Sequence, residues 1–299
     1  MTPPIPIPDW LRRLYPFEPK GFSTPHGARM NYVDEGPRSE EGVLMLHGNP
    51  TWSFYFRNLI QAISPHLRCI APDHVGMGLS EKPQAYDYRL VTRIDDIEAL
   101  ATQLGLRRIH LVVHDWGGAI GFGLAERRPD LVGKLVILNT AAFVSTRIPR
   151  RIALCRTQFP GTLLVRGANA FAWPATGMAM HRRKLSADEK RAYLWPYDSW
   201  ANRVALDAFV KDIPLEKTHP SMQTLRKIEA ALPKFSDRPA LLAWGGMDFC
   251  FDDHFFQCWR AIFPRAQVEP YGDAGHYVLE DAGPDIRRRI GGFLTANEC

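Results

Sequence analysis

The segment Leu111–Gly118, LVVHDWGG, combines an apolar run with a carboxylate and two glycines. This order is typical of a strained strand-to-helix turn that exposes one side chain at the edge of a sheet. Gly117 and Gly118 fit such a turn, because a Cβ there would clash where the helix approaches the strand. Val113 departs from the glycine that esterases often carry at that place. We therefore predict that Asp115 occupies a nucleophile elbow, where serine is usual.

An aspartate in this position changes the chemistry. A serine hydroxyl needs a base to remove its proton, whereas a carboxyl group with a reference pKa of about 3.9 is already charged at neutral pH. A carboxylate attacks carbon that bears a leaving group and becomes an ester, so a histidine is then needed to activate the water that cleaves this ester. Taken alone, Asp115 fits a helix N-cap equally well, because aspartate is a favoured capping residue.

Two further residues complete a catalytic set in the expected chain order of nucleophile, acid and histidine. Asp248 and His276 each follow a predicted strand, so that a loop can direct them toward the elbow. Asp248 is predicted to hold the Nδ1–H of His276 and to stabilise the imidazolium. Asp252 and Asp253 are rivals for the acid, but they fit better as caps of the next helix. Asn139, after an earlier strand, is not acidic and cannot replace them.

The segment Leu46–Trp52, LHGNPTW, follows an apolar run and supplies a second group of donors. The backbone N–H groups of Asn49 and Trp116 are predicted to form an oxyanion hole. Their side chains carry a carboxamide and an indole N–H, which are placed to bracket a departing anion. Each charge-assisted hydrogen bond of this kind is worth about 1.5–3 kcal/mol. The alternative is that Trp116 only packs and Asn49 only shapes the turn.

The elements that position these residues follow from an alternation of short apolar runs and helical segments. The predicted strands are Arg29–Glu35, Gly42–Leu46, Arg68–Pro72, Ile109–His114, Lys134–Leu138, Ala240–Trp244 and Gln267–Tyr271. The predicted helices include Leu90–Leu104, Ala119–Arg128 and His254–Phe263. Near-continuous apolar runs indicate strands covered on both faces of a parallel sheet. This pattern predicts an α/β fold with a mostly parallel, doubly wound sheet.

The alternation stops between residues 141 and 233 and resumes with the strand at Ala240. We predict a core formed by residues 1–140 and 234–299 and a helical cap formed by residues 141–233, inserted after the strand Lys134–Leu138. Such a cap would cover the carboxyl edge of the sheet, where ligands bind in open α/β folds. Its aromatic residues and methionines indicate an apolar substrate pocket, unless they only pack cap against core. The candidate pocket residues are Phe171, Trp173, Met178 and Tyr193.

The composition of the chain limits the kinds of molecule that we expect it to bind. The net charge of +5 is modest, and its densest basic stretch runs from Arg147 to Lys184. No nucleic-acid module accompanies it, so we expect a solvated face there, with an anionic partner or a membrane surface as the alternative. No run of about 18 apolar residues exists, so stable membrane insertion is not expected. We also expect no cofactor and no metal site, because no nucleotide loop, flavin motif or metal constellation is present.

The five cysteines are odd in number and contain no C-x-x-C pair, which argues against a disulfide framework. They fit a reducing compartment. The N-terminal stretch is rich in proline and lacks the apolar core of a signal peptide. We therefore expect a cytoplasmic protein.

Four motifs carry a resemblance to a known family. HGNPTWSFYFRNL, PDHVGMGLSEKP, HDWGGAIGFGLA and DAGHYVLED resemble the haloalkane dehalogenases of the α/β-hydrolase superfamily, and the resemblance covers essentially the whole chain. It implies Asp115 as nucleophile, His276 as base, Asp248 as acid, and Asn49 with Trp116 as the halide-stabilising pair. One branch of that family carries a glutamate acid where this chain has asparagine, so the chain resembles the branch with the later aspartate.

Further motifs narrow the resemblance. LVILNTAAF, KRAYLWPYDSWANR and DFCFDDHFF look like a subset that includes the β-lactone decarboxylases of bacterial long-chain olefin biosynthesis. These enzymes are similar to dehalogenases in triad and donor pair. Their substrate is a cis-disubstituted β-lactone instead of a haloalkane.

The sequence therefore predicts an enzyme of the haloalkane dehalogenase type, which forms an alkyl-enzyme ester, releases halide and hydrolyses the ester to an alcohol. The alternative is a β-lactone decarboxylase that gives a long-chain cis-olefin and CO₂. An epoxide hydrolase is less favoured, although Tyr193 and Tyr197 are available as acids. Trp116 departs from the arginine of fluoroacetate dehalogenases, and the complete triad argues against an inactive receptor. The expected partner is a small apolar substrate; a homo-oligomer or an assembly with biosynthetic partner enzymes is also considered.

Overall fold

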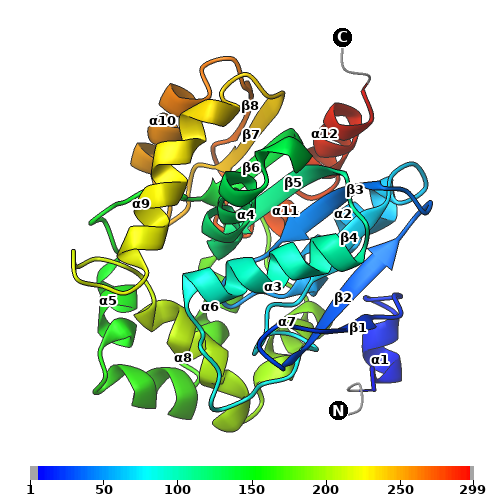
Figure 1. Ribbon diagram of the computed structural model, residues 1–299. Helices are drawn as coiled ribbons and strands as arrows, with labels where there is room; N and C mark the ends of the chain where they lie inside the picture. The colour runs from blue at the N-terminus through cyan, green and yellow to red at the C-terminus, as the bar shows by residue number, and fades with distance from the viewer. Residues whose placement is uncertain (1–5, 297–299) are drawn as a thin grey trace.

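The computed structural model describes residues 6–296, and its centre is a single twisted sheet of eight strands (Figure 1). The strand order is β1-β2-β4-β3-β5-β6-β7-β8. β2 runs antiparallel to both its neighbours, and all pairs from β4 to β8 are parallel. The strands are β1 (Lys20–Ser23), β2 (Arg29–Glu35), β3 (Glu41–Leu46), β4 (Cys69–Pro72), β5 (Arg108–Asp115), β6 (Val132–Thr140), β7 (Ala240–Gly245) and β8 (Gln267–Tyr271).

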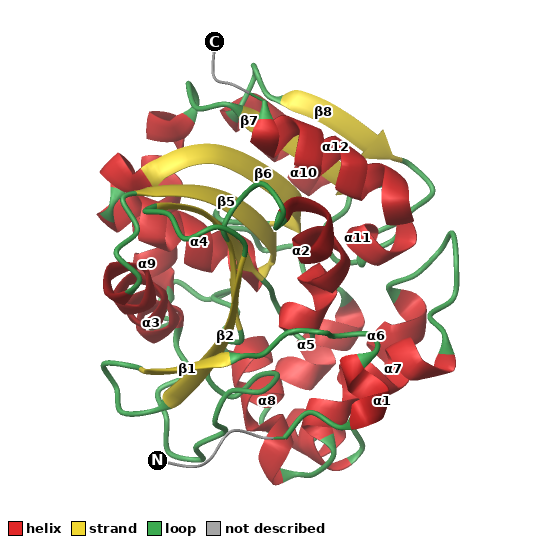
Figure 2. Cartoon of the chain, turned by 90° about the vertical axis from the view of Figure 1, so that its right-hand side faces the viewer, coloured by secondary structure: helices red, strands yellow, loops and turns green. Residues whose placement is uncertain are grey.

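Helices follow most of the strands and cover both faces of the sheet. They are α1 (Asp9–Arg12), α2 (Arg57–Ile63), α3 (Leu90–Gln103), α4 (Trp116–Arg127), α5 (Arg150–Arg156), α6 (Ala172–Met178), α7 (Ala187–Leu194), α8 (Val204–Lys211), α9 (Met222–Ala231), α10 (Asp253–Ile262), α11 (Val278–Asp281) and α12 (Gly283–Thr295). Figure 2 shows α3, α4 and α9 on one side of the strands and α2 and α12 on the other. The predicted doubly wound α/β fold is thus confirmed.

The two hydrophobic cores explain why the strands read as continuous apolar runs. Along β5, Leu111 and Val113 pack into the core beneath α3 and α4, whereas Val112 between them packs into the core beneath α2 and α12. Alternate side chains point to opposite faces of a strand, so both faces must be apolar when both are covered. Every residue of β6 is buried for the same reason.

All seven predicted strands are present, and the bounds of two of them, Arg29–Glu35 and Gln267–Tyr271, agree with β2 and β8. The strand β1 was not predicted. It is an edge strand in which only Phe22 is buried, so it carries no apolar run that sequence analysis could detect. Its place in the sheet depends on pairing with β2, which is a tertiary contact.

The segment between β6 and β7 contains helices and no strand. Most of it lies at the carboxyl ends of the parallel strands, but α9 packs against α3 and α4 on a face of the sheet. Leu225 and Ile228 of α9 belong to the core on that face. The limits 141–233 for a separate cap therefore remain a prediction, and α9 is continuous with the core.

Candidate active site

Asp115 ends β5 and directly precedes α4. Its backbone has φ of 52° and ψ of −126°, a positive φ that is rare for a residue with a Cβ. Residues held in such conformations cluster at active sites, where the surrounding structure enforces the strain. Although Asp115 stands at the N-cap position, its side chain makes no capping hydrogen bond. The capping alternative raised by the sequence therefore has no support in the structure.

Glycines allow other segments to approach the elbow closely. A Cβ built on Gly48 would lie 1.9 Å from Oδ1 of Asp115, and one on Gly117 would lie 1.9 Å from the carbonyl oxygen of Leu46. Both distances are far below van der Waals contact, so no larger residue fits. The hydroxyl of Thr140, at the end of β6, donates to the carbonyl oxygen of Asp115 and holds the turn from the other side.

The carboxylate of Asp115 is held by backbone donors. The N–H of Asn49 donates to Oδ1 at 2.6 Å, and the N–H of Trp116 also supports the charged form. Burial raises the pKa of Asp115, and the charge of His276 together with these two amides opposes the rise without cancelling it. A buried carboxylate that is only partly compensated is a strong nucleophile toward an apolar electrophile.

His276 is oriented from its far side. Its Nδ1–H donates to Oδ2 of Asp248 at 2.8 Å, and Oδ1 of Asp248 accepts the N–H of Cys250 at 2.6 Å. Its Nε2 lies 3.8 Å from Oδ2 of Asp115. Burial lowers the pKa of His276, but the charge and hydrogen bond of Asp248 and the charge of Asp115 outweigh this effect, so its pKa is raised. The ring of Phe251 stacks on the imidazole, with centroids 5.8 Å apart.

The neighbouring acids occupy other positions. Asp252 caps α10 through a hydrogen bond from the N–H of His254, as the sequence suggested. Asn139 bridges β6 to β7, donating to the carbonyl oxygen of Gly245 and accepting its N–H. The structure thus brings Asp115, His276 and Asp248 together and leaves the rivals outside the site.

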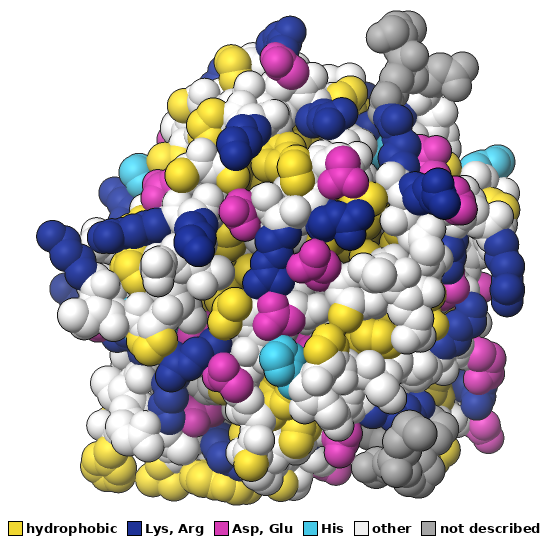
Figure 3. Space-filling model, in the orientation of Figure 1, with side chains coloured by type: hydrophobic (Ala, Val, Ile, Leu, Met, Phe, Trp, Pro, Cys, Tyr) yellow, Lys and Arg dark blue, Asp and Glu magenta, His cyan; other side chains and the backbone are white. Residues whose placement is uncertain are grey.

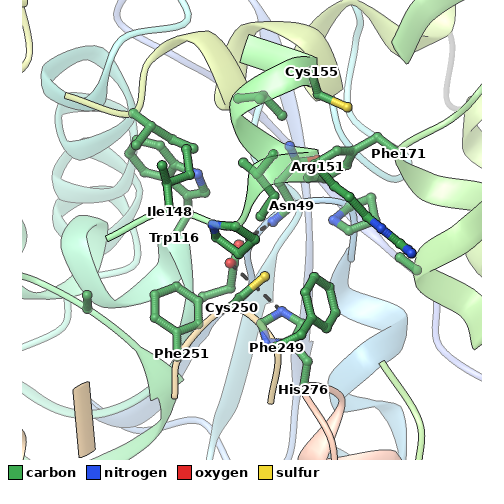
Figure 4. Close-up of a pocket in the computed structure, with 18 of the residues that line it drawn as sticks. Asn49, Trp116, Ile148, Arg151, Cys155, Phe171, Phe249, Cys250, Phe251 and His276 are labelled. Carbon is green, nitrogen blue, oxygen red and sulfur yellow. Dashed lines mark hydrogen bonds and ion pairs between the residues drawn. The ribbon is translucent and has the colours of Figure 1, made fainter. Parts of the chain in front are cut away.

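The donor side chains of Asn49 and Trp116 reach the same cavity (Figure 4). Nδ2 of Asn49 donates to the carbonyl oxygen of Leu206 in α8 at 3.0 Å, which uses one of its two hydrogens and leaves the other. Within residues 6–296 the indole N–H of Trp116 has no hydrogen-bond partner. The edge-on packing of Phe209 against the indole, with centroids 5.5 Å apart, fixes the ring.

A cavity of about 230 Å³ opens above these groups. Its lining is mostly apolar and includes Phe171 and Met178, two of the four predicted pocket residues. Phe143, Ile148 and Phe249 line it as well. Such a cavity accepts an apolar substrate, with Asp115 and His276 at one place in its wall and with Arg147 and Arg151 of the segment after β6 also lining it.

The other two predicted pocket residues, Trp173 and Tyr193, do not line this cavity. Trp173 is on the outer face of α6 with 67% of its surface exposed, because Pro174 and Met178 take the inward positions of that helix. Tyr193 is buried, and its hydroxyl donates to Oε1 of Glu280 at 2.7 Å. The hydroxyl of Tyr197 donates to the carbonyl oxygen of Thr51, also away from the cavity.

These positions weaken the epoxide hydrolase reading. That reaction needs a tyrosine hydroxyl directed at the opening oxygen, and neither Tyr193 nor Tyr197 lines the cavity. Both hydroxyls already have partners in the protein. The structure therefore offers no acid for epoxide opening at the places where the sequence suggested one.

Arg93 is a site residue that sequence analysis missed. It lies on α3, only 2% exposed, with its guanidinium 3.5 Å from the ring centre of Phe209 and 5.7 Å from that of Trp116. Over residues 6–296 its one ion-pair contact joins Nη1 to Oδ2 of Asp212 at 3.3 Å, and its Nε and Nη2 atoms have no hydrogen-bond partner. Burial lowers the pKa of Arg93 to about 10, against the opposing charge of Asp212. A cation thus stands behind the donor indole, and nothing in the pattern of α3 indicated it.

The described residues contain no cluster of three or more His, Cys, Asp or Glu placed to hold a metal ion. Over the same residues no helix is long and apolar enough to cross a membrane. The four cysteines within the described part of the chain, Cys69, Cys155, Cys250 and Cys258, are unpaired.

Residues 42–283 match the family described as alpha/beta hydrolase fold. A cis-3-alkyl-4-alkyloxetan-2-one decarboxylase of Shewanella oneidensis is 46% identical over 294 residues, covering 96% of this chain and 92% of the relative. A decarboxylase of the same name from Xanthomonas campestris is 44% identical, covering 95% and 98%. Haloalkane dehalogenase 2 of Mycobacterium tuberculosis is 30% identical, covering 93% and 95%.

A solved structure agrees with this grouping. The haloalkane dehalogenase DbeA from Bradyrhizobium elkani superposes with a TM-score of 0.85 at 30% identity, covering 93% of this chain and 97% of that one. The chain therefore belongs to the α/β-hydrolase family, in the group that contains the haloalkane dehalogenases and the cis-3-alkyl-4-alkyloxetan-2-one decarboxylases.

Proposed function

We propose that this chain is a decarboxylase of cis-3-alkyl-4-alkyloxetan-2-ones, with Asp115 as nucleophile. The identities of 46% and 44% to decarboxylases, against 30% to a dehalogenase, support this alternative over the dehalogenase reading that the sequence motifs favoured. The observation that carries the proposal is a buried carboxylate at the base of an apolar cavity, beside two anion-binding donors. Apolar walls suit two alkyl chains, and the donors suit the carboxylate that forms when the ring opens.

In the first step, a carboxylate oxygen of Asp115 attacks C4 of the lactone ring. The C4–O1 bond breaks and its electron pair stays on the ring oxygen, which becomes part of a carboxylate on C3. The side-chain N–H donors of Asn49 and Trp116 stabilise that new anion, because their backbone N–H groups already hold the carboxylate of Asp115. The product of this step is an ester between Asp115 and the opened substrate, and relief of strain in the four-membered ring drives it forward.

In the second step, the bond between C3 and the carboxylate carbon breaks and its electrons form the C3–C4 double bond. CO₂ leaves, the C4–O bond to Asp115 breaks, and the free carboxylate of Asp115 is restored. Attack inverts C4, and loss of the two groups from opposite sides then yields the cis-alkene. The two steps together consume no water and need no oxidant or reductant. A protonated His276, 3.8 Å from Oδ2 of Asp115, stabilises the departing carboxylate.

Haloalkane dehalogenation is the second candidate, because the donor pair and the nucleophile suit it equally. Its first step is the same displacement with halide as the leaving group. The alkyl ester that results has no carboxylate to lose, so water activated by His276 must hydrolyse it. We propose that this reaction is a side activity of the shared site.

We also propose that the enzyme works in the cytoplasm. The unpaired state of the four described cysteines supports a reducing compartment. A long-chain lactone is poorly soluble in water, so direct transfer from the enzyme that forms it is favourable. An assembly with such partner enzymes, or a homo-oligomer, belongs to the same proposal.

The function is tested by incubating the purified protein with a long-chain cis-β-lactone and, separately, with 1-bromobutane, and by measuring CO₂, alkene and bromide. We expect one CO₂ and one alkene for each lactone consumed, and a kcat/KM for the lactone far above that for bromide release from 1-bromobutane. Asp115→Asn is expected to lose both activities. Turnover of the haloalkane at about 10⁴ M⁻¹s⁻¹ or more, in the ordinary range for a native substrate, with the lactone untouched would show a dehalogenase instead.

A further inference from the structure

Large apolar side chains gather on the outer surface of the segment between β6 and β7. Leu154 on α5 is 48% exposed, Phe159 after it 79%, Leu163 54% and Trp173 on α6 67%. Figure 3 shows hydrophobic side chains along the lower left edge of the molecule, where Figure 1 draws α5 and the helical turns that follow it. Exposed apolar patches of this kind mark interaction sites in soluble proteins. We refer to Leu154, Phe159, Leu163 and Trp173 as the cap patch.

The same segment is strongly basic. Residues 147–184 contain eight arginines and lysines, and residues 141–187 contain no aspartate or glutamate. Because the whole chain carries a net charge of only +5, the remainder of the chain is net acidic. The positive charge is therefore concentrated on the segment that also carries the cap patch.

Several of these cations have no carboxylate partner. Arg147 pairs with Asp252, and Arg156 pairs with Glu216. Over residues 6–296, no ion pair involves Arg150, Arg151, Arg166 or Lys184. The guanidinium of Arg166 lies 4.8 Å from the ring centre of the exposed Trp200 and so joins charge to aromatic surface. Arg151 lines the catalytic cavity and donates to Sδ of Met178, and Arg166 donates to Oε1 of Gln84, but no carboxylate of the described residues neutralises any of these four charges.

The helices that carry the cap patch also form walls of the catalytic cavity. Ile152 of α5 and Met178 of α6 line the cavity, whereas Leu154 and Trp173 of the same helices face outward. Both helices thus carry apolar side chains on the cavity side and on the outer side, and α5 carries three arginines besides. A helix that is buried on one side only would carry polar residues on the other.

We propose that the cap patch docks this enzyme onto the surface of an anionic lipid bilayer. Exposed Trp, Phe and Leu side chains insert at the headgroup boundary, and neighbouring Arg side chains bind acidic headgroups. The absence of acidic residues across residues 141–187 suits such a surface better than a protein partner of mixed charge. The docking is peripheral, since within the described residues no helix is suited to crossing a membrane.

Docking would place the walls of the catalytic cavity against lipid. A long-chain lactone and its alkene product both partition into lipid, so the enzyme would exchange them with the bilayer without passing them through water. This consequence rests on the proposed function, whereas the patch and its charge do not.

The test uses the full chain and vesicles, with binding measured by co-sedimentation. We expect binding to phosphatidylcholine vesicles that contain phosphatidylglycerol, weaker binding to phosphatidylcholine alone, and loss of the difference at high salt. Phe159→Ser with Leu163→Ser removes apolar surface, and Arg150→Glu with Arg166→Glu reverses two charges. Each pair is expected to lower the partition coefficient about tenfold or more.

Matched controls change the same chemistry elsewhere. Val91→Ser with Val268→Ser removes exposed apolar surface outside the segment, and Arg226→Glu with Arg260→Glu reverses two exposed charges on α9 and α10. These variants are expected to bind vesicles like the wild type. Circular dichroism is used to check that all variants are folded. Turnover of a short-chain, water-soluble lactone is expected to stay unchanged in the patch variants.

Failure of vesicle binding by the wild type, or equal binding by patch and control variants, overturns the proposal. The proposal is also overturned if the wild type does not bind vesicles and light scattering shows that it is a dimer while the patch variants are monomers. The cap patch would then join two copies of the chain. Vesicle binding by a protein that does not turn over lactones would leave the docking intact and reject the proposed function alone.

Discussion

The Nε2 atom of His276 lies 3.8 Å from Oδ2 of Asp115, beyond hydrogen-bond distance, while Nδ1 of the same ring is held by Asp248 at 2.8 Å. The imidazole is therefore oriented by its acid partner and leaves the nucleophile free to attack carbon. In this position it can act as a charge beside the leaving carboxylate or as a base for water. The two candidate reactions differ in which of these roles they need.

An isotope experiment separates the two roles. In H₂¹⁸O, hydrolysis of an alkyl ester delivers one ¹⁸O atom to the carboxylate of Asp115, whereas elimination of CO₂ and alkene delivers none. After many turnovers of a haloalkane, mass spectrometry of the peptide with Asp115 is expected to show the label. After an equal number of turnovers of the β-lactone the same peptide is expected to be unlabelled. Label after lactone turnover would show that water cleaves the intermediate.

His276→Ala removes the base and leaves the nucleophile in place. With 1-bromobutane we expect an alkyl adduct on Asp115 to accumulate, visible in the intact mass of the protein, because ester hydrolysis is blocked. With the lactone we expect slower turnover without a lasting adduct, because the intermediate eliminates without water. An unmodified mass, under conditions where the wild type releases bromide, would contradict the covalent mechanism.

The pH dependence is expected to differ between the reactions. Asp248 and Asp115 raise the pKa of His276. As the pH falls, this residue is therefore protonated at a higher pH than an ordinary histidine, and it can then no longer act as a base. Bromide turnover at steady state should therefore fall as the pH drops through that raised pKa. Lactone turnover needs the carboxylate of Asp115 but does not need His276 in its basic form, so its acid limb should lie at lower pH. Coincident acid limbs in the kcat profiles would argue that both reactions need neutral His276.

Trp116→Phe tests the anion-binding donor. The fold is expected to persist, because phenylalanine keeps the edge-on contact with Phe209. The loss of one preorganised N–H donor is expected to lower kcat by about two orders of magnitude. An unchanged kcat for both substrates would restrict the role of Trp116 to packing.

Arg93 is predicted to strengthen this donor through charge. We expect Arg93→Met to lower kcat for the lactone about tenfold with little change in KM, because a cation near the indole favours the developing carboxylate. Arg93→Lys keeps the charge and should restore much of kcat. Asp212→Asn is the matched control, because it weakens the same ion pair and keeps the cation. Equal loss of kcat in Asp212→Asn and Arg93→Met, without rescue by lysine, would indicate a purely structural role.

The local pattern of the chain was sufficient to select Asp115, Asp248 and His276, which the structure brings together. The elbow at Asp115 was predicted because a sharp turn between strand and helix requires glycine at adjacent positions, which is a constraint of a few residues. The inner strands were predicted because both faces of the sheet are covered and each strand is apolar throughout. Asp248 and His276 were assigned because in this fold the catalytic residues follow successive strands at one edge of the sheet.

Tertiary packing decided the rest. Trp173 and Phe171 are both aromatic residues near one helix, and only the docking of α6 determines that the first faces solvent and the second faces the cavity. The hydroxyl of Tyr193 donates to Glu280, and the guanidinium of Arg93 lies buried beside the ring of Trp116. In both cases the partner is far away in the chain. The local periodicity of the sequence predicts which face of a helix or strand is apolar. Which other element packs on that face depends on contacts between residues far apart in the chain, and no short segment contains that information.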